Sequence, residues 1–169
     1  MDIIEAIFSR RSIRKYTSAE VPQEILDKIL KAGMSAPSAH NLQPWHFLII
    51  KSRKKLEQIR TFHPHAEMLR EAALAIIICG DLTLDDQIGY LVQACAAATE
   101  NILLAAHGLG WGAVWLGLYP RSERQNRIIR LFQLPENIIP LTMVALGAPN
   151  EIKHKIERFK PDRIHLNQW

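Results

Sequence analysis

The sequence has few cysteines and none of the short motifs that mark a metal site or a nucleotide fold. Its two cysteines, Cys79 and Cys95, lie in apolar segments, which is typical of buried free thiols rather than of a disulfide or a metal site. The chain has no Cys-x-x-Cys pair and no His-Glu-x-x-His, so metal chemistry has no support. It also lacks G-x-G-x-x-G after a strand, a P-loop and G-x-S-x-G. These absences argue against a Rossmann dinucleotide site, nucleoside-triphosphate hydrolysis and serine-hydrolase chemistry.

The first residues do not have the pattern of a signal peptide, and the sequence has no strong excess of one charge. Its first residues, MDIIE, contain no basic stretch followed by a long apolar run, so we expect no signal peptide. Unpaired cysteines then favour a reducing, cytoplasmic location. The net charge of +4 would suit an anionic ligand, but it is too small to predict nucleic-acid binding by itself. We therefore expect no nucleic-acid partner.

One segment, residues 86–107, is alanine-rich and almost free of charge. Its length and apolar character raise the question of a membrane-spanning helix. Gln93, Thr99, Glu100 and Asn101 interrupt the run, and no charged anchors flank it as a spanning helix would need. We predict instead a helix that is buried on nearly all sides, inside the protein or at a subunit interface, and no membrane partner.

The 169 residues, 48% of them hydrophobic, are enough for a single domain spanning residues 1–169 with a substantial core. Hydrophobic periodicity, caps and breakers divide the chain into alternating helices and strands. The expected helices cover residues 3–10, 22–34, 54–60, 86–107 and 121–132, and the expected strands cover 46–51, 73–80, 112–115 and 140–146. This alternation indicates an α/β or α+β protein with a small sheet.

Three guanidinium groups and a hydroxyl fall within the segment RRSIR at residues 10–14. Arginine forks bind phosphate oxygens two at a time. Alternate residues of an extended segment point the same way, so Arg10, Ser12 and Arg14 can converge on one ligand. The same composition also fits a solvated basic turn or a nucleic-acid contact. The residues of this segment leave these alternatives open.

Two further segments combine glycine or proline with polar or aromatic groups. In the loop PSAHNLQPW at residues 37–45, two prolines hold the chain extended while Ser38, Asn41 and Gln43 offer donors and acceptors to a polar ring edge. The alternative is a structural loop that satisfies its own backbone. The glycines of GWGAVWLG at residues 110–117 would let a flat ligand approach the backbone, or would only form a tight helix-to-strand connection. A cationic clamp and a polar loop beside a strand suggest a phosphorylated, ring-bearing ligand.

In this order, the segments resemble the nitroreductase family of FMN-dependent oxidoreductases. The family pattern has RRSIR near residue ten, a P-S-x-x-N-x-Q-P-W loop, an alanine-rich helix with ENILLAA, then G-x-G-A-V-W-L-G and a C-terminal arginine. The chain matches at residues 10–14, 37–45, 100–106, 110–117 and 158, nearly its whole length, in the form of a compact member. The resemblance implies an α+β fold with a small central mixed β-sheet wrapped by helices, and a homodimer with FMN at its interface.

The resemblance also implies roles for the basic residues. Arg10, Ser12 and Arg14 would hold the FMN phosphate, ribityl chain and pyrimidine edge, and Arg11 belongs to the same motif. Arg158 would complete the phosphate clamp.

Loop and strand residues would hold the ring itself. Leu116 and Gly117 would pass under the flavin, with one backbone N–H addressing flavin N5. Two departures from the family pattern are Ala94, where similar sequences often carry an acid, and Ala72, where a proline is common. The residues implied to line the flavin from the partner subunit are Pro37, Ser38 and Ala39, with Asn41 nearby.

The implied activity transfers electrons in two half-reactions. NAD(P)H would give a hydride to flavin N5 and leave, and a nitroaromatic, quinone or similar small acceptor would then take the electrons by a ping-pong mechanism. The cofactor performs this chemistry, so no catalytic side chain is named. The alternatives are a different reductive reaction on the same fold, a non-catalytic flavin-storing or regulatory protein, and a basic nucleic-acid module resting on residues 10–15. Absence of the extra segments found in dehalogenating or flavin-fragmenting relatives argues against the first.

Overall fold

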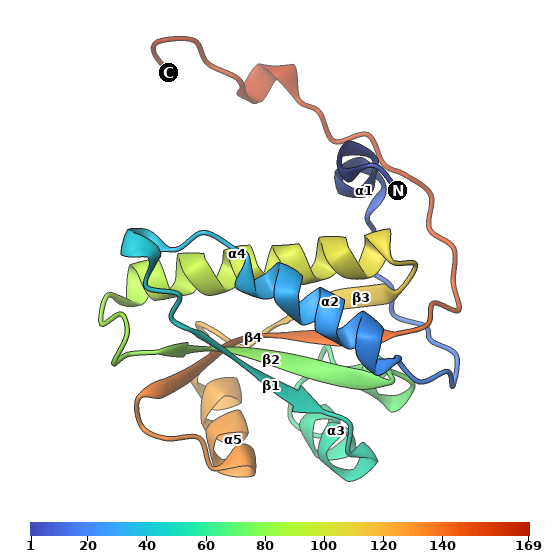
Figure 1. The fold of residues 1–169 in the computed structure, drawn as a ribbon, viewed down its shortest axis with the longest axis vertical. Helices are drawn as coiled ribbons and strands as arrows, with labels where there is room; N and C mark the ends of the chain where they lie inside the picture. The colour runs from blue at the N-terminus through green and yellow to red at the C-terminus, as the bar shows by residue number, and fades with distance from the viewer.

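A four-stranded sheet lies between two pairs of helices in the computed structural model, which describes residues 1–169 (Figure 1). The strand order is β1-β2-β4-β3, and all three neighbouring pairs are antiparallel. The α+β class is therefore confirmed, but the expected mixed pairing is wrong. β2 precedes α4 in the chain and β3 follows it, and the two strands run in the same direction. They do not pair with each other, because β4 lies between them and is antiparallel to both. The strands are β1 (Trp45–Ile50), β2 (Leu74–Asp81), β3 (Gly112–Gly117) and β4 (Ile138–Gly147).

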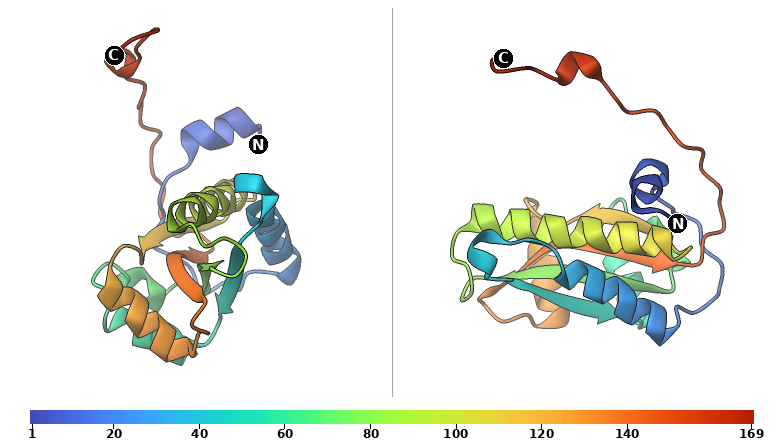
Figure 2. Two further views of the ribbon diagram at one scale, coloured as in Figure 1. Left: turned by 90° about the vertical axis from the view of Figure 1, so that its left-hand side faces the viewer. Right: turned by 45° about the horizontal axis from the view of Figure 1, so that its top comes forward.

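Helices α2 and α4 cover one face of the sheet, and α3 and α5 cover the other (Figure 2). All five expected helices are present, to within two residues at each end. Three short 3₁₀ helices were not expected, because they lie in polar segments without hydrophobic periodicity. The helices are α1 (Ile3–Ser9), α2 (Gln23–Met34), α3 (Arg53–Arg60), α4 (Ile88–Gly108) and α5 (Ser122–Phe132), and the 3₁₀ helices are η1 (Ala39–Asn41), η2 (Glu67–Arg70) and η3 (Pro161–Arg163).

The central strand β2 is buried on both faces, which explains its continuous apolar sequence. Ile76 and Ile78 pack beneath α4 and α2, whereas Ile77 packs with α3 and α5 on the opposite face. Gly80 lets α4 approach the sheet closely, because a Cβ there would lie 2.4 Å from Leu91 Cγ. The two layers of core thus share one strand.

Helix α4 is long and apolar enough to meet the length and hydropathy criteria for a membrane span. Its polar side chains, however, make hydrogen bonds within the fold. Thr99 Oγ1 lies 2.7 Å from Thr142 Oγ1 of β4, and Asn101 Nδ2 donates to the carbonyl of Ala32 in α2 at 3.0 Å. The inner side of α4 is a core surface, while the outer side, around Ala97, remains partly open in the single chain. The expectation of burial on nearly all sides is therefore met on the inner side only.

The two ends of the chain stand apart from this body (Figures 1 and 2). Asp2 caps α1, with its carboxylate accepting from the N–H of Ile4 at 2.9 Å. Ala6 is the one buried residue of α1. Residues 150–169, which we call the C-terminal arm, extend past α1 and beyond α4. Both ends display large apolar side chains to solvent.

Candidate functional site

The RRSIR segment follows α1 and runs along the outer edge of β3. The N–H of Ile13 donates to the carbonyl of Ala113 at 3.0 Å. The Ile13 side chain packs on Gly112, where a Cβ would approach Ile13 Cγ2 to 2.7 Å. Ile13 thus fastens the centre of the segment to the sheet, and this places the neighbouring Ser12 and Arg14 at the edge of β3.

The basic side chains reach different parts of the chain. Arg10 Nε lies 3.3 Å from Glu100 Oε1 on α4, and Arg11 donates to the carbonyl of His154 in the C-terminal arm. Arg14 is exposed, and its N–H donates to the carboxylate of Glu151. The segment therefore joins α4 to the arm, with the Arg10 and Arg11 side chains directed to different partners.

Arg158 lies in the arm, against α1. It lines a cavity of about 630 Å³ together with Ile7 and Phe8 of that helix, and neither Arg10 nor Arg14 lines the same cavity. A phosphate clamp made of Arg10 and Arg158 is therefore not preassembled within one chain.

Next to the Arg10–Glu100 ion pair, a hydrogen bond joins the end of α1 to α4. Ser9 Oγ lies 2.8 Å from His107 Nε2 in the last turn of α4. Burial, followed by the nearby Arg10 charge, holds the pKa of His107 below its ordinary value. Sequence reasoning assigned no role to Glu100 or His107, because nothing local in the sequence places residues 90 to 100 positions away beside the segment.

The PSAHNLQPW loop lies on the first half of α4. Pro37, Ser38 and Ala39 line a cavity of about 310 Å³ with Tyr90, Gln93, Ala94 and Ala97. The departure at Ala94 thus falls where the loop meets α4. Asn41 does not line this cavity and instead accepts from Gln43 Nε2 at 3.0 Å.

The same loop satisfies part of its own backbone. Ser38 Oγ accepts from the N–H of Gln43 at 2.9 Å. His40, Asn41 and Gln43 adopt left-handed φ angles of 51°, 55° and 51°. Such conformations are costly for residues other than glycine and occur often at ligand-binding sites. The loop is therefore internally bonded and also borders a cavity, and its contact with a ligand stays a prediction.

The RRSIR segment and the PSAHNLQPW loop contact different stretches of α4. RRSIR meets the helix at Glu100, whereas the loop meets it between Tyr90 and Ala97. Along the axis, Gln93 and Glu100 are about 10 Å apart. The segment and the loop therefore meet α4 about two turns apart and do not contact the same stretch of it.

Gly117 ends β3 at the edge that the RRSIR segment follows. In an antiparallel strand, the N–H and C=O of one residue point to the same side, and the side alternates along the strand. Because Ala113 accepts from Ile13 on the outer side, Trp115 and Gly117 also direct their N–H groups outward, away from β4. A Cβ on Gly117 would meet nothing within 4 Å, so the surface is open where that side chain would point.

The neighbouring Leu116 offers only its backbone, because its side chain is buried in the core between the sheet, α3 and α5. The Gly117 carbonyl is already bonded, accepting from His63 Nε2 at 3.1 Å and from Arg124 Nη1 at 3.0 Å. Sequence reasoning missed both donors, since no motif surrounds either residue. An open glycine, outward N–H groups and a neighbouring cationic segment fit a ring that carries an anionic tail.

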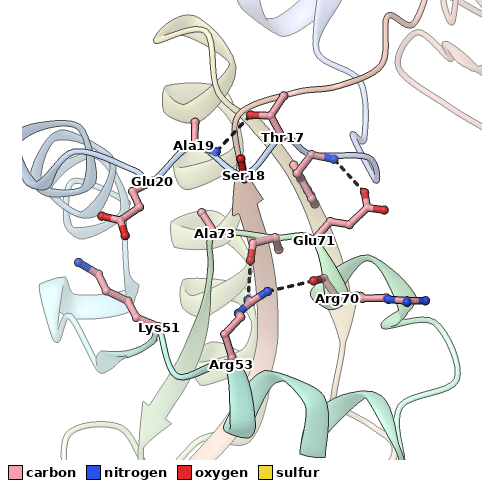
Figure 3. A pocket seen from close by; sticks show the side chains of 11 residues that line it. Thr17, Ser18, Ala19, Glu20, Lys51, Arg53, Arg70, Glu71 and Ala73 are labelled. Atoms are coloured by element: carbon pink, nitrogen blue, oxygen red, sulfur yellow. Dashed lines mark hydrogen bonds between the residues drawn. The ribbon is translucent and has the colours of Figure 1, made fainter.

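A separate pocket of about 460 Å³ lies where the chain enters α2, and Figure 3 shows its lining. Arg53 donates to the carbonyls of Arg70 and Ala72 at 3.0 and 2.6 Å, and Glu71 accepts from the N–H of Tyr16 at 3.3 Å. The departure at Ala72 is thus fully buried and hydrogen bonded. None of the predicted cofactor residues lines this pocket.

Comparison with known proteins agrees with this arrangement. The model of the nitroreductase family matches residues 7–74 and 63–148. A protein of Methanothermobacter thermautotrophicus named "Putative NADH dehydrogenase/NAD(P)H nitroreductase" is 50% identical over 169 residues, covering 100% of this chain and 88% of that protein. A crystal structure of the same name from Parabacteroides distasonis has 36% identity and a TM-score of 0.95, covering 99% and 98% of the two chains.

A structure described as an FMN-dependent nitroreductase, from Clostridium difficile R20291, has 31% identity and a TM-score of 0.88, covering 98% of this chain and 99% of that one. The match extends through the whole sheet and the segments at both of its edges. The chain belongs to the nitroreductase family.

Proposed function

We propose that the protein is an FMN-dependent oxidoreductase that passes electrons from NAD(P)H to a small conjugated acceptor. The observation that carries this proposal is the outer edge of β3. There, the RRSIR segment lies alongside Ala113, and the N–H groups of Trp115 and Gly117 point outward beside open space. Family membership and the FMN-dependent and NAD(P)H-dependent names of its relatives support the same assignment.

The chain's own residues would bind and orient the cofactor. Arg10, Ser12 and Arg14 would hold the phosphate, ribityl chain and pyrimidine edge, with Arg11 in the same segment and Arg158 completing the phosphate clamp. When bound, FMN supplies the capacity to accept a hydride and pass on its electrons. Cations beside the pyrimidine edge would stabilise negative charge on the reduced ring.

The ring would rest on the backbone of Leu116 and Gly117, with the Gly117 N–H facing N5. The PSAHNLQPW loop borders a cavity on α4. This cavity supports the proposal that the loop of one chain contacts the flavin bound by the second chain. The loop residues that we propose as contributors from the partner subunit are Pro37, Ser38 and Ala39, with Asn41 nearby.

We propose that the protein acts as a homodimer with two equivalent flavin sites. One chain leaves the apolar side chains of α1 and of the C-terminal arm exposed, and it leaves the outer side of α4 partly open. Exposed apolar surface of this extent marks an interaction site, and a second copy covers it symmetrically. The exposed apolar residues are Ile3, Ile4, Ile7 and Phe8 of α1, and Ile152, Ile156, Phe159, Ile164, Leu166 and Trp169 of the arm.

We also propose a ping-pong reaction in a single cytoplasmic domain. One open flavin face must serve donor and acceptor in turn, so NAD(P)H leaves before a nitroaromatic, quinone or similar acceptor enters. No side chain is assigned a catalytic role, since binding and orientation by the residues above suffice for hydride transfer at the cofactor.

The test begins with the purified protein. We expect a yellow protein that releases noncovalent FMN on acid treatment, is bleached anaerobically by NADH or NADPH, and gives parallel double-reciprocal lines when acceptor concentration is varied. Intersecting lines would require a ternary complex and contradict the ping-pong order. FMN that neither nucleotide bleaches would favour the flavin-storing alternative. A colourless protein that takes up no FMN and is retained on DNA in a salt-dependent way would favour the nucleic-acid alternative.

A further inference from the structure

The carbonyl of Gly117 receives hydrogen bonds from two side chains that lie on different segments. His63, just after α3, places Nε2 at 3.1 Å, and Arg124, in the first turns of α5, places Nη1 at 3.0 Å. Both donors approach from the side of the sheet that α3 and α5 cover. The last residue of β3 is therefore held by groups from outside the sheet, at the point where its own side chain contributes nothing to packing.

The orientation of His63 is itself fixed. The N–H of His65 donates to His63 Nδ1 at 3.3 Å, so Nδ1 carries a lone pair and Nε2 carries the hydrogen that Gly117 accepts. His63 is 2% exposed, and burial holds the pKa of its imidazole below the ordinary value. A neutral imidazole with this tautomer is the form that can accept from His65 and donate to Gly117 at once.

These bonds matter because the end of a strand at a free sheet edge is easily displaced, and glycine adds backbone freedom. The Gly117 carbonyl points to the same outer side as its N–H, so the bonds that hold the carbonyl also hold this residue in place at the sheet edge. We propose that His63 and Arg124 are positioning residues that hold the Gly117 backbone so that its N–H faces flavin N5. This inference rests on the proposed function and extends it to side chains that do not touch the flavin.

With FMN bound in this way, the Arg124 guanidinium would add a positive charge near the reacting end of the ring. A cation there favours the negatively charged reduced ring over the oxidised one. Removing Arg124 should therefore make the flavin midpoint potential more negative, an effect that a purely structural contact would not produce.

The experiment compares flavin-loaded variants by anaerobic stopped-flow reduction with NADH. We expect Arg124→Gln and His63→Leu to slow reduction by about tenfold, the effect of losing one such hydrogen bond, with the KM for NADH little changed. His63→Gln, which keeps a donor near Nε2, should recover most of the rate. Arg130→Gln is the matched control, because it removes the same charge from an exposed position of α5 and leaves the Gly117 bonds in place.

Two measurements separate the outcomes. Wild-type rates and potential in both Arg124→Gln and His63→Leu would overturn the positioning role while leaving the proposed function intact. A wild-type protein that neither holds FMN nor oxidises NAD(P)H would overturn the proposed function itself. If Arg124→Gln does not fold, Arg124→Lys decides: a slower rate at unchanged KM supports the role, and a wild-type rate contradicts it.

Discussion

The body of the fold and its two ends differ in how far a single chain can bury them. Every residue of the two core clusters lies between Tyr16 and Leu146, around the sheet and its four covering helices. In α1 and the C-terminal arm, apolar side chains are instead open to water, with Ile152 93% exposed and Trp169 fully exposed. The body buries its apolar side chains in a continuous core, whereas the ends leave theirs exposed, and in the arm these apolar residues alternate with many charged ones.

This difference connects folding to function. The predicted phosphate ligands lie outside the body or at its border, with Arg10 at the end of α1 and Arg158 in the arm. The predicted ring contact at Gly117 lies inside the body, at the end of β3. The proposed dimer would therefore complete both the burial of the ends and the cofactor site, so that cofactor binding and assembly depend on each other.

Removing the C-terminal arm is the strongest test of the comparison. A chain that ends at Asn150 keeps every residue of both core clusters, so we expect it to fold. It loses Arg158 and the apolar side chains of the arm, so we expect a monomer that does not retain FMN. Light scattering gives the mass, near-ultraviolet circular dichroism reports the core, and flavin fluorescence reports binding. A truncated dimer that still holds FMN would show that the arm is dispensable for both.

A pair of isoleucine substitutions tests the comparison at single residues. Ile78 is fully buried in β2, and Ile78→Ala should lower the free energy of unfolding by about 2–5 kcal/mol at any protein concentration. Ile152 is exposed in one chain, so Ile152→Ala should leave the isolated fold within about 0.5 kcal/mol of wild type and weaken only association. Urea titrations at low and high protein concentration separate the two. An Ile152→Ala effect that is the same at both concentrations would mean that the arm packs on its own chain.

The elements of the body were predictable from local sequence, whereas their pairing was not. The apolar run of β2, the Asp2 cap and the long alanine-rich helix are local signals, and each predicted element is present. The position of β4 between β2 and β3 depends on contacts between distant segments, and for this reason the mixed sheet was wrongly expected.

The site shows the same division. Residues 10–14 and 37–45 are predicted as ligand contacts from their motifs, because their chemistry is concentrated in a few consecutive positions. The hydrogen bonds of His63 and Arg124 to Gly117 were not predicted. His63 lies 54 residues and Arg124 lies 7 residues from Gly117 in the sequence, and both bond to its backbone carbonyl, which no side-chain pattern indicates.

Substitution of the clamp arginines gives an intermediate effect. Arg10→Ala and Arg158→Ala should each weaken FMN binding by about 1.5–3 kcal/mol, roughly ten- to hundredfold, because each removes a charge-assisted contact to the phosphate. The apoprotein should stay folded, since neither residue belongs to a core cluster. Arg14→Ala should act differently, through the pyrimidine edge. Arg130→Ala on the exposed side of α5 is the control for loss of charge. Unchanged FMN affinity in both clamp variants would show that the phosphate lies elsewhere.

The smallest expected effect is a pH dependence that belongs to the body alone. Burial, and after it the charge of Arg124, holds the pKa of His63 below its ordinary value. The unfolded chain takes up a proton on His63 near pH 6.5, while the folded chain takes it up only at a lower pH. Between these two values the unfolded state binds more protons, so stability falls as the pH is lowered, by at most about 1.4 kcal/mol per pH unit.

Comparison with His63→Gln isolates this contribution, because the variant cannot titrate at that position. The difference in unfolding free energy between wild type and variant should be constant above about pH 6.5 and should change below it. Arg124→Gln should raise the His63 pKa, which an NMR titration of the imidazole measures directly. The same behaviour should survive in the chain that ends at Asn150, since His63, Arg124 and Gly117 all lie within the body. A His63 pKa that changes when the arm is removed would show that the arm affects the core, and that the body and the ends are not independent.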